Sequence, residues 1–144
     1  MGFLVVYYSK GGKTRKIADV ITQELGCKAV DTGREAPDIS GVDLLVVGSG
    51  TYIGKPGKQL QEFLSGLKPI SNGKAAFFLT SSGNDPRPVK FLRNALEAKG
   101  YKVVSTFSCR GQYLLSSRGH PTEEDLKNAK VFAADLKDKI QKEN

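Results

Sequence analysis

Short, continuous apolar runs alternate along this chain with segments whose apolar residues recur at helical spacing. The first run is 3–8 (FLVVYY), comparable runs occupy 42–48, 74–80 and 101–109, and a shorter one lies at 28–31. An apolar run without polar alternation is typical of a strand that is buried on both faces of a parallel sheet. The chain is therefore expected to contain five such strands.

The segments between these runs predict helices. Apolar residues recur at helical spacing over 13–25, and Gly26 follows where a glycine commonly ends a helix. A second helix is expected to carry an apolar stripe over 60–67 and to end before Pro69, and a third is expected over 88–99. Each predicted helix would cover one face of the sheet.

The last helix is expected to begin after Thr122 as N-cap. Three acidic residues, 123–125, fall in its first turn, where the helix dipole favours negative charge. Strands that alternate with helices imply a parallel sheet covered on both faces. The sequence therefore predicts one three-layer α/β domain over residues 1–144.

The chain is basic, with 22 Lys and Arg against 15 Asp and Glu and a formal net charge of +7. The basic residues are spread along the chain and form no recognisable nucleic-acid module, so no nucleic-acid partner is expected. No apolar run approaches the roughly 20 residues that span a bilayer, and the first residues do not resemble a signal peptide. No transmembrane segment is expected, and the predicted location is the cytoplasm.

The cysteines and the histidine do not indicate a metal site. Cys27 and Cys109 lack the CxxC spacing, and His120 is the only histidine. Both cysteines are interpreted as small apolar strand residues in a reducing compartment. His120, two residues before the predicted N-cap, is interpreted as a neighbour of that cap rather than as an acid or base.

Four polar segments leave the carboxyl ends of the predicted strands, at 9–14, 49–57, 81–88 and 110–121. They are rich in Gly, Ser, Thr and Asn. They are also longer than turns that only connect a strand to a helix need to be. In an open parallel sheet, ligands collect at this edge, near the point where the strand order reverses. The four segments therefore predict a binding site there.

The first segment ends in GGKT, the ending of a nucleoside-triphosphate P-loop. That loop also requires a glycine five positions before Gly12, where Tyr7 stands. The two glycines would let the backbone curl so that successive N–H groups, at the start of a helix, meet a single phosphate. The hydroxyls of Ser9 and Thr14 are expected to add donors to that phosphate. The alternative interpretation is an ordinary strand-to-helix turn.

Three of the segments together resemble the FMN-binding loops of flavodoxins. Ser9-x-x-Gly12-x-Thr14 follows the first strand, as the phosphate loop does in that family. The stretches 48–54 (GSGTYIG) and 80–85 (TSSGND) resemble the loops that contact the flavin ring. The resemblance covers nearly the whole chain and implies a flavodoxin-like short-chain fold with strand order 2-1-3-4-5 and noncovalently bound FMN.

The resemblance also implies a set of cofactor-binding residues. The phosphate would lie at Ser9, Lys10, Gly11, Gly12, Lys13 and Thr14. The ring would be flanked by Gly50, Thr51, Tyr52, Ile53 and Gly54, with the pyrimidine at Ser81, Ser82, Gly83 and Asn84.

The chain departs from the family pattern in three ways. Flavodoxins are usually acidic and this chain is basic; two lysines flank its phosphate loop; and no aromatic residue lies between Phe78 and Phe91 to stack on the ring. Tyr113, in the long segment 110–121, is a candidate for that contact, unless the segment only tucks Leu114 and Leu115 under the sheet edge.

A flavin-binding chain of this kind has two candidate functions. The first is an electron carrier that docks transiently on redox partner proteins, and the absence of an acid–base pair or nucleophile near the ring favours it. The alternative is a small FMN-dependent oxidoreductase that acts on a quinone or a porphyrinogen-type substrate. A flavodoxin-like domain that binds partners without flavin is a third interpretation. No catalytic residue is predicted.

Overall fold

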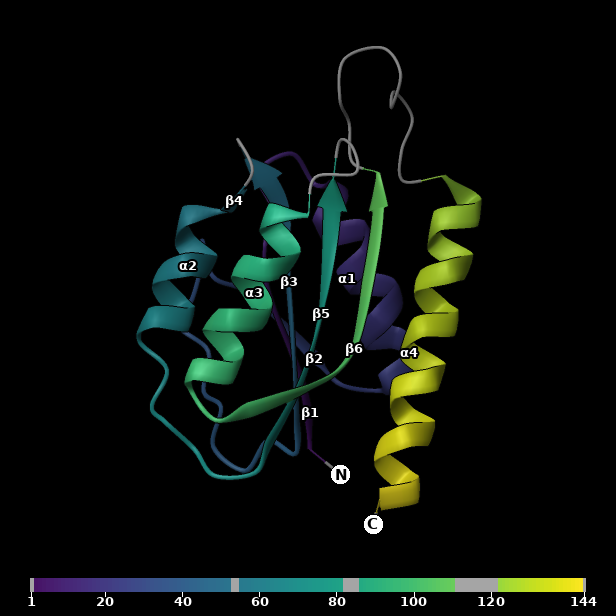
Figure 1. The fold of residues 1–144 in the computed structure, drawn as a ribbon. Coiled ribbons are helices and arrows are strands. Elements are labelled where there is room, and N and C mark those ends of the chain that lie inside the picture. The colour runs from purple at the N-terminus through teal and green to yellow at the C-terminus, as the bar shows by residue number, and fades with distance from the viewer. Residues whose placement is uncertain (1, 53–54, 82–85, 111–121, 144) are drawn as a thin grey trace.

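The computed structural model describes residues 2–52, 55–81, 86–110 and 122–143. Five parallel strands form its central sheet in the order β2-β1-β3-β5-β6 (Figure 1). Because β5 and β6 are the fourth and fifth parallel strands of the chain, this order confirms the predicted 2-1-3-4-5. The strands are β1 (Phe3–Tyr8), β2 (Lys28–Asp31), β3 (Leu44–Tyr52), β5 (Gly73–Ser81) and β6 (Tyr101–Arg110).

The register brings the carboxyl ends of the central strands to one edge. Tyr8 at the end of β1 lies opposite Ser49 of β3, and Gly50 of β3 lies opposite Thr80 of β5. In Figure 1 the arrowheads of β3, β5 and β6 accordingly point to the same end of the molecule. The carboxyl ends of these three strands and of β1 therefore lie at one edge of the sheet.

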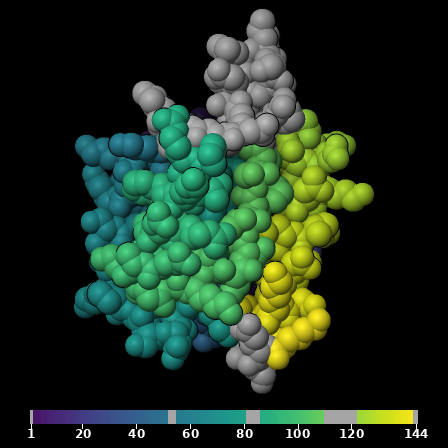
Figure 2. Space-filling view, in the orientation of Figure 1, coloured from purple at the N-terminus to yellow at the C-terminus, as the bar shows by residue number. Residues whose placement is uncertain are grey.

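The helices cover both faces of the sheet, as predicted. Helices α1 (Lys13–Leu25) and α4 (Glu123–Glu143) share one apolar cluster with alternate residues of the strands, such as Val5 and Phe78. Helices α2 (Lys58–Ser65) and α3 (Arg87–Ala98) share the other cluster, with Phe77 among its strand residues. Figure 2 shows α3 and α2 over one face, with α4 alongside.

The ends of α1 and α4 follow the sequence signals. Gly26 ends α1 at a φ of 67°, and its N–H donates to the Thr22 carbonyl. Thr122 begins α4: its hydroxyl accepts from the Asp125 N–H at 3.2 Å, and its own N–H donates to the Asp125 carboxylate at 2.8 Å. This reciprocal pair is a capping box, which satisfies N–H groups that have no partner within the helix.

Several predicted boundaries were wrong: β3 begins at Leu44, and β5 and α3 each differ from the predicted range by one residue at either end. Strand β3 continues to Tyr52, into a stretch predicted as loop, because its backbone pairs with β5 and then with the two-residue antiparallel strand β4 (Lys55–Pro56). Strand β6 extends by one residue to Arg110, which pairs with β5. Helix α2 ends at Ser65, well before the proline, because Gly66 closes it with an N–H bond to the Glu62 carbonyl.

Within the residues described, no helix is both long enough and apolar enough to cross a membrane.

Candidate functional site

The loop between β1 and α1 is organised by the Ser9 side chain. Its hydroxyl oxygen accepts hydrogen bonds from the backbone N–H of Gly12 at 3.0 Å and of Arg15 at 3.3 Å. Gly12 has a φ of 87°, in the left-handed region, so the chain turns sharply into the helix there. A residue with a side chain would be strained in this conformation, and glycine is not.

The loop leaves polar backbone groups exposed at the start of α1. The first N–H groups of a helix have no partner within the helix, and Ser9 accepts from only two of those near this end. In the part of the chain that the structure describes, no acceptor lies opposite the N–H groups of Lys13 and Thr14. The helix dipole adds positive potential here, and α1 has no acidic residue in its first turn. The arrangement suits an anion.

Space is available beside this loop. Apart from its own chain neighbours, a methyl group built on Gly11 or on Gly12 would meet no atom of the described residues within 4 Å. Neither glycine is therefore required by the packing of the protein around it. Lys10 is exposed and Lys13 half-buried, so two ammonium groups can reach the same region.

The Thr14 hydroxyl does not face the loop, contrary to the expectation that it donates to a ligand. It lies 2.8 Å from the Thr80 hydroxyl of β5, and the two side chains are 2% and 5% exposed. The hydroxyl pair fastens the first turn of α1 to the strand that leads into the 82–85 segment.

A second buried hydroxyl organises the end of β3. Ser49 is fully buried; it donates to the Gly50 carbonyl at 2.7 Å and accepts from the Gly57 N–H at 2.8 Å. The hairpin between these glycines is paired through Thr51 with Pro56 and through Tyr52 with Lys55. Ser49 therefore closes the base of the hairpin and links it to the start of α2.

The hairpin also lies against β1. A methyl group built on Gly57 would come within 2.4 Å of the Tyr8 ring, so only glycine allows this approach. The Tyr8–Gly57 contact thus joins the end of β1 to the β3–β4 hairpin, and the Thr14–Thr80 pair joins the start of α1 to the end of β5. The structure brings these predicted site segments together.

Several predicted site residues lie outside the described residues: Ile53, Gly54, Ser82, Gly83, Asn84 and Tyr113, and also His120. Gly50 and Thr51 lie within β3, and Tyr52 and Ser81 are the last residues of β3 and β5. The assignments of these residues to the ring and the pyrimidine stay predictions. Ser49, Gly57 and Thr80 were not predicted as organising residues, because a buried hydroxyl or a close backbone contact has no local sequence signal.

Both cysteine thiols are partly buried, and burial raises their pKa. Burial, with a smaller contribution from the negative charge of Asp125, raises the pKa of the Cys109 thiol to about 12. Burial alone raises the pKa of Cys27 to about 11. The reactive thiolate is therefore scarce at neutral pH. No group of three or more His, Cys, Asp or Glu side chains that could hold a metal ion occurs within the described ranges.

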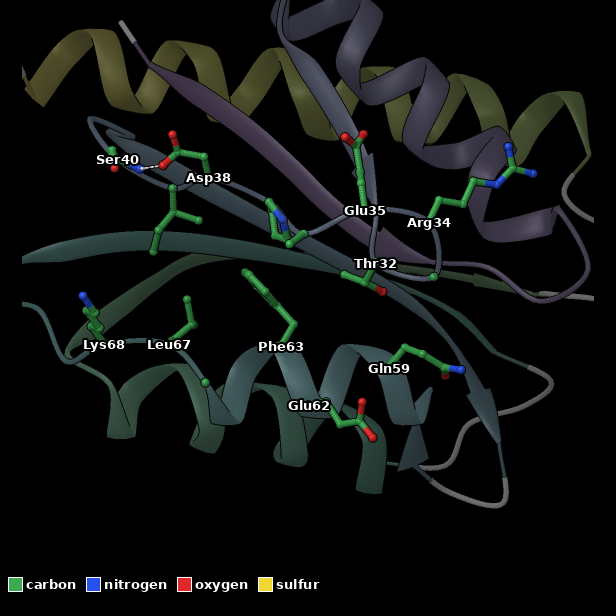
Figure 3. A pocket seen from close by; sticks show the side chains of 15 residues that line it. Thr32, Arg34, Glu35, Asp38, Ser40, Gln59, Glu62, Phe63, Leu67 and Lys68 are labelled. Carbon is green, nitrogen blue, oxygen red and sulfur yellow. Dashed lines mark hydrogen bonds between the residues drawn. The ribbon is translucent and has the colours of Figure 1, made fainter.

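A separate groove of about 820 Å³ lies between the segment 32–40 and α2. Figure 3 shows Phe63 of α2 pointing toward that segment, with charged residues of both signs around the opening. The Ser40 N–H donates to the Asp38 carboxylate at 3.0 Å, and this bond lowers the pKa of Asp38. The groove shares no lining residue with the β1–α1 loop or the β3–β4 hairpin.

Comparison with known proteins finds relatives of this chain both by sequence and by fold. A family model described as a flavodoxin domain matches residues 4–118. An uncharacterized protein of Methanocaldococcus jannaschii is 33% identical over 149 residues, which cover 94% of this chain and 98% of that protein.

Two solved structures share the fold. A flavodoxin from the domain Archaea superposes with a TM-score of 0.78 at 18% identity, covering 98% of this chain and 99% of that one. A flavoprotein in complex with FMN from Lactobacillus acidophilus superposes with a TM-score of 0.61 at 21% identity, covering 74% and 92%.

Proposed function

The chain belongs to the flavodoxin family, and from this premise we propose that it binds FMN at the carboxyl edge of its sheet and carries electrons between redox partner proteins. The observation that carries the proposal is the β1–α1 loop, where Ser9, Gly12 and the first turn of α1 form an anion site with open space beside it. The FMN complex among the structural neighbours supports the choice of cofactor.

The residues of the loop fit a single terminal phosphate. The N–H groups of Lys13 and Thr14 would donate to phosphate oxygens, and the ammonium groups of Lys10 and Lys13 would offset the negative charge. The loop lacks the glycine at position 7 that a triphosphate loop requires. Bound FMN would supply the chemistry, because its ring takes up and releases one or two electrons.

The chain's own contribution is to hold the cofactor in place. The Thr14–Thr80 pair fixes the start of α1 on β5, and Ser49 fixes the β3–β4 hairpin, where the ring is proposed to lie. In the described parts of the segments 9–14, 49–57, 81–88 and 110–121 there is no Asp, Glu or His. Asp85 and His120 of these segments lie outside the described residues. An electron carrier requires no side chain that exchanges protons with a substrate, and the described parts of the site suit that function.

The proposal extends to the organisation and location of the protein. Residues 1–144 are proposed to form one domain that works in the cytoplasm. The two cysteines are both unpaired, which suits a reducing compartment. The alternative function is oxidoreduction of a quinone or a porphyrinogen-type substrate with FMN. It would use the same cofactor site, and the experiment below distinguishes it from electron carriage.

The test begins with the purified protein and its cofactor preference. We expect the flavin absorption spectrum after incubation with FMN, and binding of FMN much tighter than that of riboflavin, which lacks the phosphate. ATP should not compete with FMN. Equal affinity for FMN and riboflavin would contradict the phosphate site, and rapid NADPH-dependent turnover of a quinone would favour the enzyme.

Gly12→Ala tests the loop itself, with Gly26→Ala as its matched control. Both glycines have positive φ, at 87° and 67°, and a methyl group on either meets no atom within 4 Å. Each substitution should therefore destabilise the fold by a similar strain, about 1 kcal/mol. Only Gly12→Ala should also weaken FMN binding, measured by quenching of flavin fluorescence. Equal effects on FMN binding would place the phosphate elsewhere.

A further inference from the structure

Five basic side chains surround the proposed cofactor site at the carboxyl edge of the sheet. They follow the three central strands β1, β3 and β5, and we call them the basic rim. Four of them are exposed and Lys13 is half-buried. The basic rim consists of Lys10, Lys13, Lys55, Lys58 and Arg87.

Contacts within the fold hold the rim together. Lys10 and Lys58 each lie within two residues of the contact between Tyr8 and Gly57. Lys55 belongs to β4, and α3, which begins at Arg87, packs against β4. The Thr14–Thr80 bond ties the helix that begins at Lys13 to β5. The rim is therefore one surface rather than five scattered charges.

Acidic residues flank the rim at both ends. The segment that leaves β2 carries Asp31, Glu35 and Asp38 against one arginine. At the other end, the acidic residues 123–125 begin α4, which Figure 1 places beside the carboxyl end of β6. No described residue of the segments that leave the three central strands at this edge is acidic. The described acidic residues at this edge thus lie on either side of the rim.

The phosphate of FMN would not cancel this charge. A phosphate monoester carries about −1.5 to −2 at neutral pH, and Lys10 and Lys13 are the rim residues nearest to its proposed place. Lys55 and Lys58 are exposed, lie on the hairpin side of the edge and are further from the proposed phosphate. A partner that approaches the flavin ring from solvent would meet them.

We propose that the basic rim docks an acidic redox partner protein over the proposed flavin. This inference rests on the proposed function. Opposite charge at an interface raises the rate of productive encounter more than the final affinity, which suits a transient electron-transfer complex. A basic patch with acidic residues at both ends favours a compact acidic protein surface, whereas a nucleic acid, charged along its length, would meet repulsion at both ends.

The first test uses two small oxidants of opposite charge. Reduced FMN-loaded protein passes one electron to each ferricyanide, an anion, or to each tris(phenanthroline)cobalt(III), a cation. Raising the ionic strength from about 0.01 to 0.5 M shortens the Debye length from roughly 30 Å to under 10 Å. We expect added salt to slow the reaction with ferricyanide and to accelerate the reaction with the cobalt complex. The reverse pattern would overturn the proposal.

A matched pair of double variants separates the rim from the net charge. Lys55→Gln with Lys58→Gln removes two exposed rim charges, and Lys28→Gln with Lys102→Gln removes two exposed charges at the amino ends of β2 and β6. Steering by a charged surface changes association rates by about 10- to 1000-fold. We therefore expect the rim variant to react with ferricyanide about three- to tenfold more slowly at low salt. Equal slowing by both variants would show that only net charge matters and would overturn the proposal.

The second test does not depend on the flavin. An acidic plant-type ferredoxin, basic cytochrome c, a short single-stranded oligonucleotide and vesicles containing phosphatidylglycerol are each added to the ¹⁵N-labelled protein. We expect the ferredoxin to shift the amide signals of Lys10, Lys55, Lys58 and Arg87, and cytochrome c to leave them unchanged. Tighter binding of the oligonucleotide or the vesicles at these residues would overturn the assignment to a protein partner.

The two tests also distinguish the inference from the proposed function. If the protein took up no FMN but showed the amide shifts with ferredoxin, the proposal of FMN binding would be refuted and the proposed docking surface would stand. A protein that binds FMN and reacts equally with both oxidants at every salt concentration would retain the cofactor and refute the docking surface.

Discussion

Two pairs of glycines, one at each edge of the sheet, have different surroundings. At the amino edge, a methyl group on Gly100 would lie 1.7 Å from the Ile70 carbonyl oxygen, and one on Gly73 would lie 2.7 Å from the Tyr101 ring. At the carboxyl edge, Gly11 and Gly12 have no atom within 4 Å of such a group. The first pair is needed because backbones and rings pack closely, whereas the second pair leaves space that the protein does not fill.

This contrast separates residues that hold the fold from residues that are available to a ligand. The connections at the amino edge are bonded to each other: the Ile70 N–H donates to the Lys99 carbonyl at 2.9 Å, and the Gly73 N–H donates to the Gly100 carbonyl at 3.3 Å. The β1–α1 loop has its own internal bonds to Ser9 but no packed neighbour at its glycines. Substitutions at the two edges should therefore affect different measurements.

The largest effect is expected for Gly100→Ala. Its φ of 91° strains any residue with a side chain, and the new methyl group would overlap the Ile70 carbonyl, so the 70–73 connection must move. Strain and overpacking each cost about 1–3 kcal/mol, so the free energy of unfolding should fall by about 3 kcal/mol or more in a urea titration. Gly26→Ala, which is strained but open, is the control. If the free energy of unfolding fell equally in the two variants, close packing around Gly100 would not contribute to stability.

A smaller loss of stability is expected for Thr80→Val. The valine has nearly the same shape, but it leaves the buried Thr14 hydroxyl without its partner at 2.8 Å. An unsatisfied buried polar group costs about 1–3 kcal/mol, so the free energy of unfolding should fall within that range. Thr80→Ser keeps a hydroxyl and should lose less. If the two variants were equally stable, the bond would not be what fastens α1 to β5.

The smallest effect on stability is expected for Gly11→Ala. Gly11 is not among the glycines with positive φ, and the new methyl group meets nothing. The free energy of unfolding should change by less than about 0.5 kcal/mol, as for most surface substitutions. FMN affinity should nevertheless fall roughly tenfold, about 1.4 kcal/mol, because the methyl group would occupy the space proposed for the phosphate. Unchanged FMN affinity would show that the ligand does not use this space.

The accuracy of the sequence predictions followed the range of the interactions involved. Helix α1 and its end at Gly26 were predicted because apolar spacing and a left-handed glycine cap are local features. The Thr122 cap of α4 was predicted for the same reason, and its bonds span only three residues. The end of β3 was not predicted, because 49–52 (SGTY) has no apolar periodicity and becomes strand only by pairing with its neighbours.

The candidate site divides in the same way. The sequence identified the β1–α1 loop from its glycines and hydroxyls, and its resemblance to a family supplied the expected cofactor. It assigned the Thr14 hydroxyl to the ligand, whereas the structure pairs that hydroxyl with a residue 66 positions away. It did not indicate that Ser49 binds the Gly57 N–H, because nothing near either residue specifies the other.

By itself, the sequence determined the alternation of strands and helices, the residues that turn inward and the place of the polar loops, because hydrophobic periodicity and capping act over a few residues. Tertiary structure alone decided which hydroxyls are buried, where the β3–β4 hairpin is fastened and which basic residues share one edge. Those features depend on contacts between residues that are distant in the chain, and such contacts exist only after the strands have aligned their carboxyl ends. The glycines show both levels: their positions can be read from the sequence, but whether each is surrounded by atoms or by open space is a property of the folded molecule.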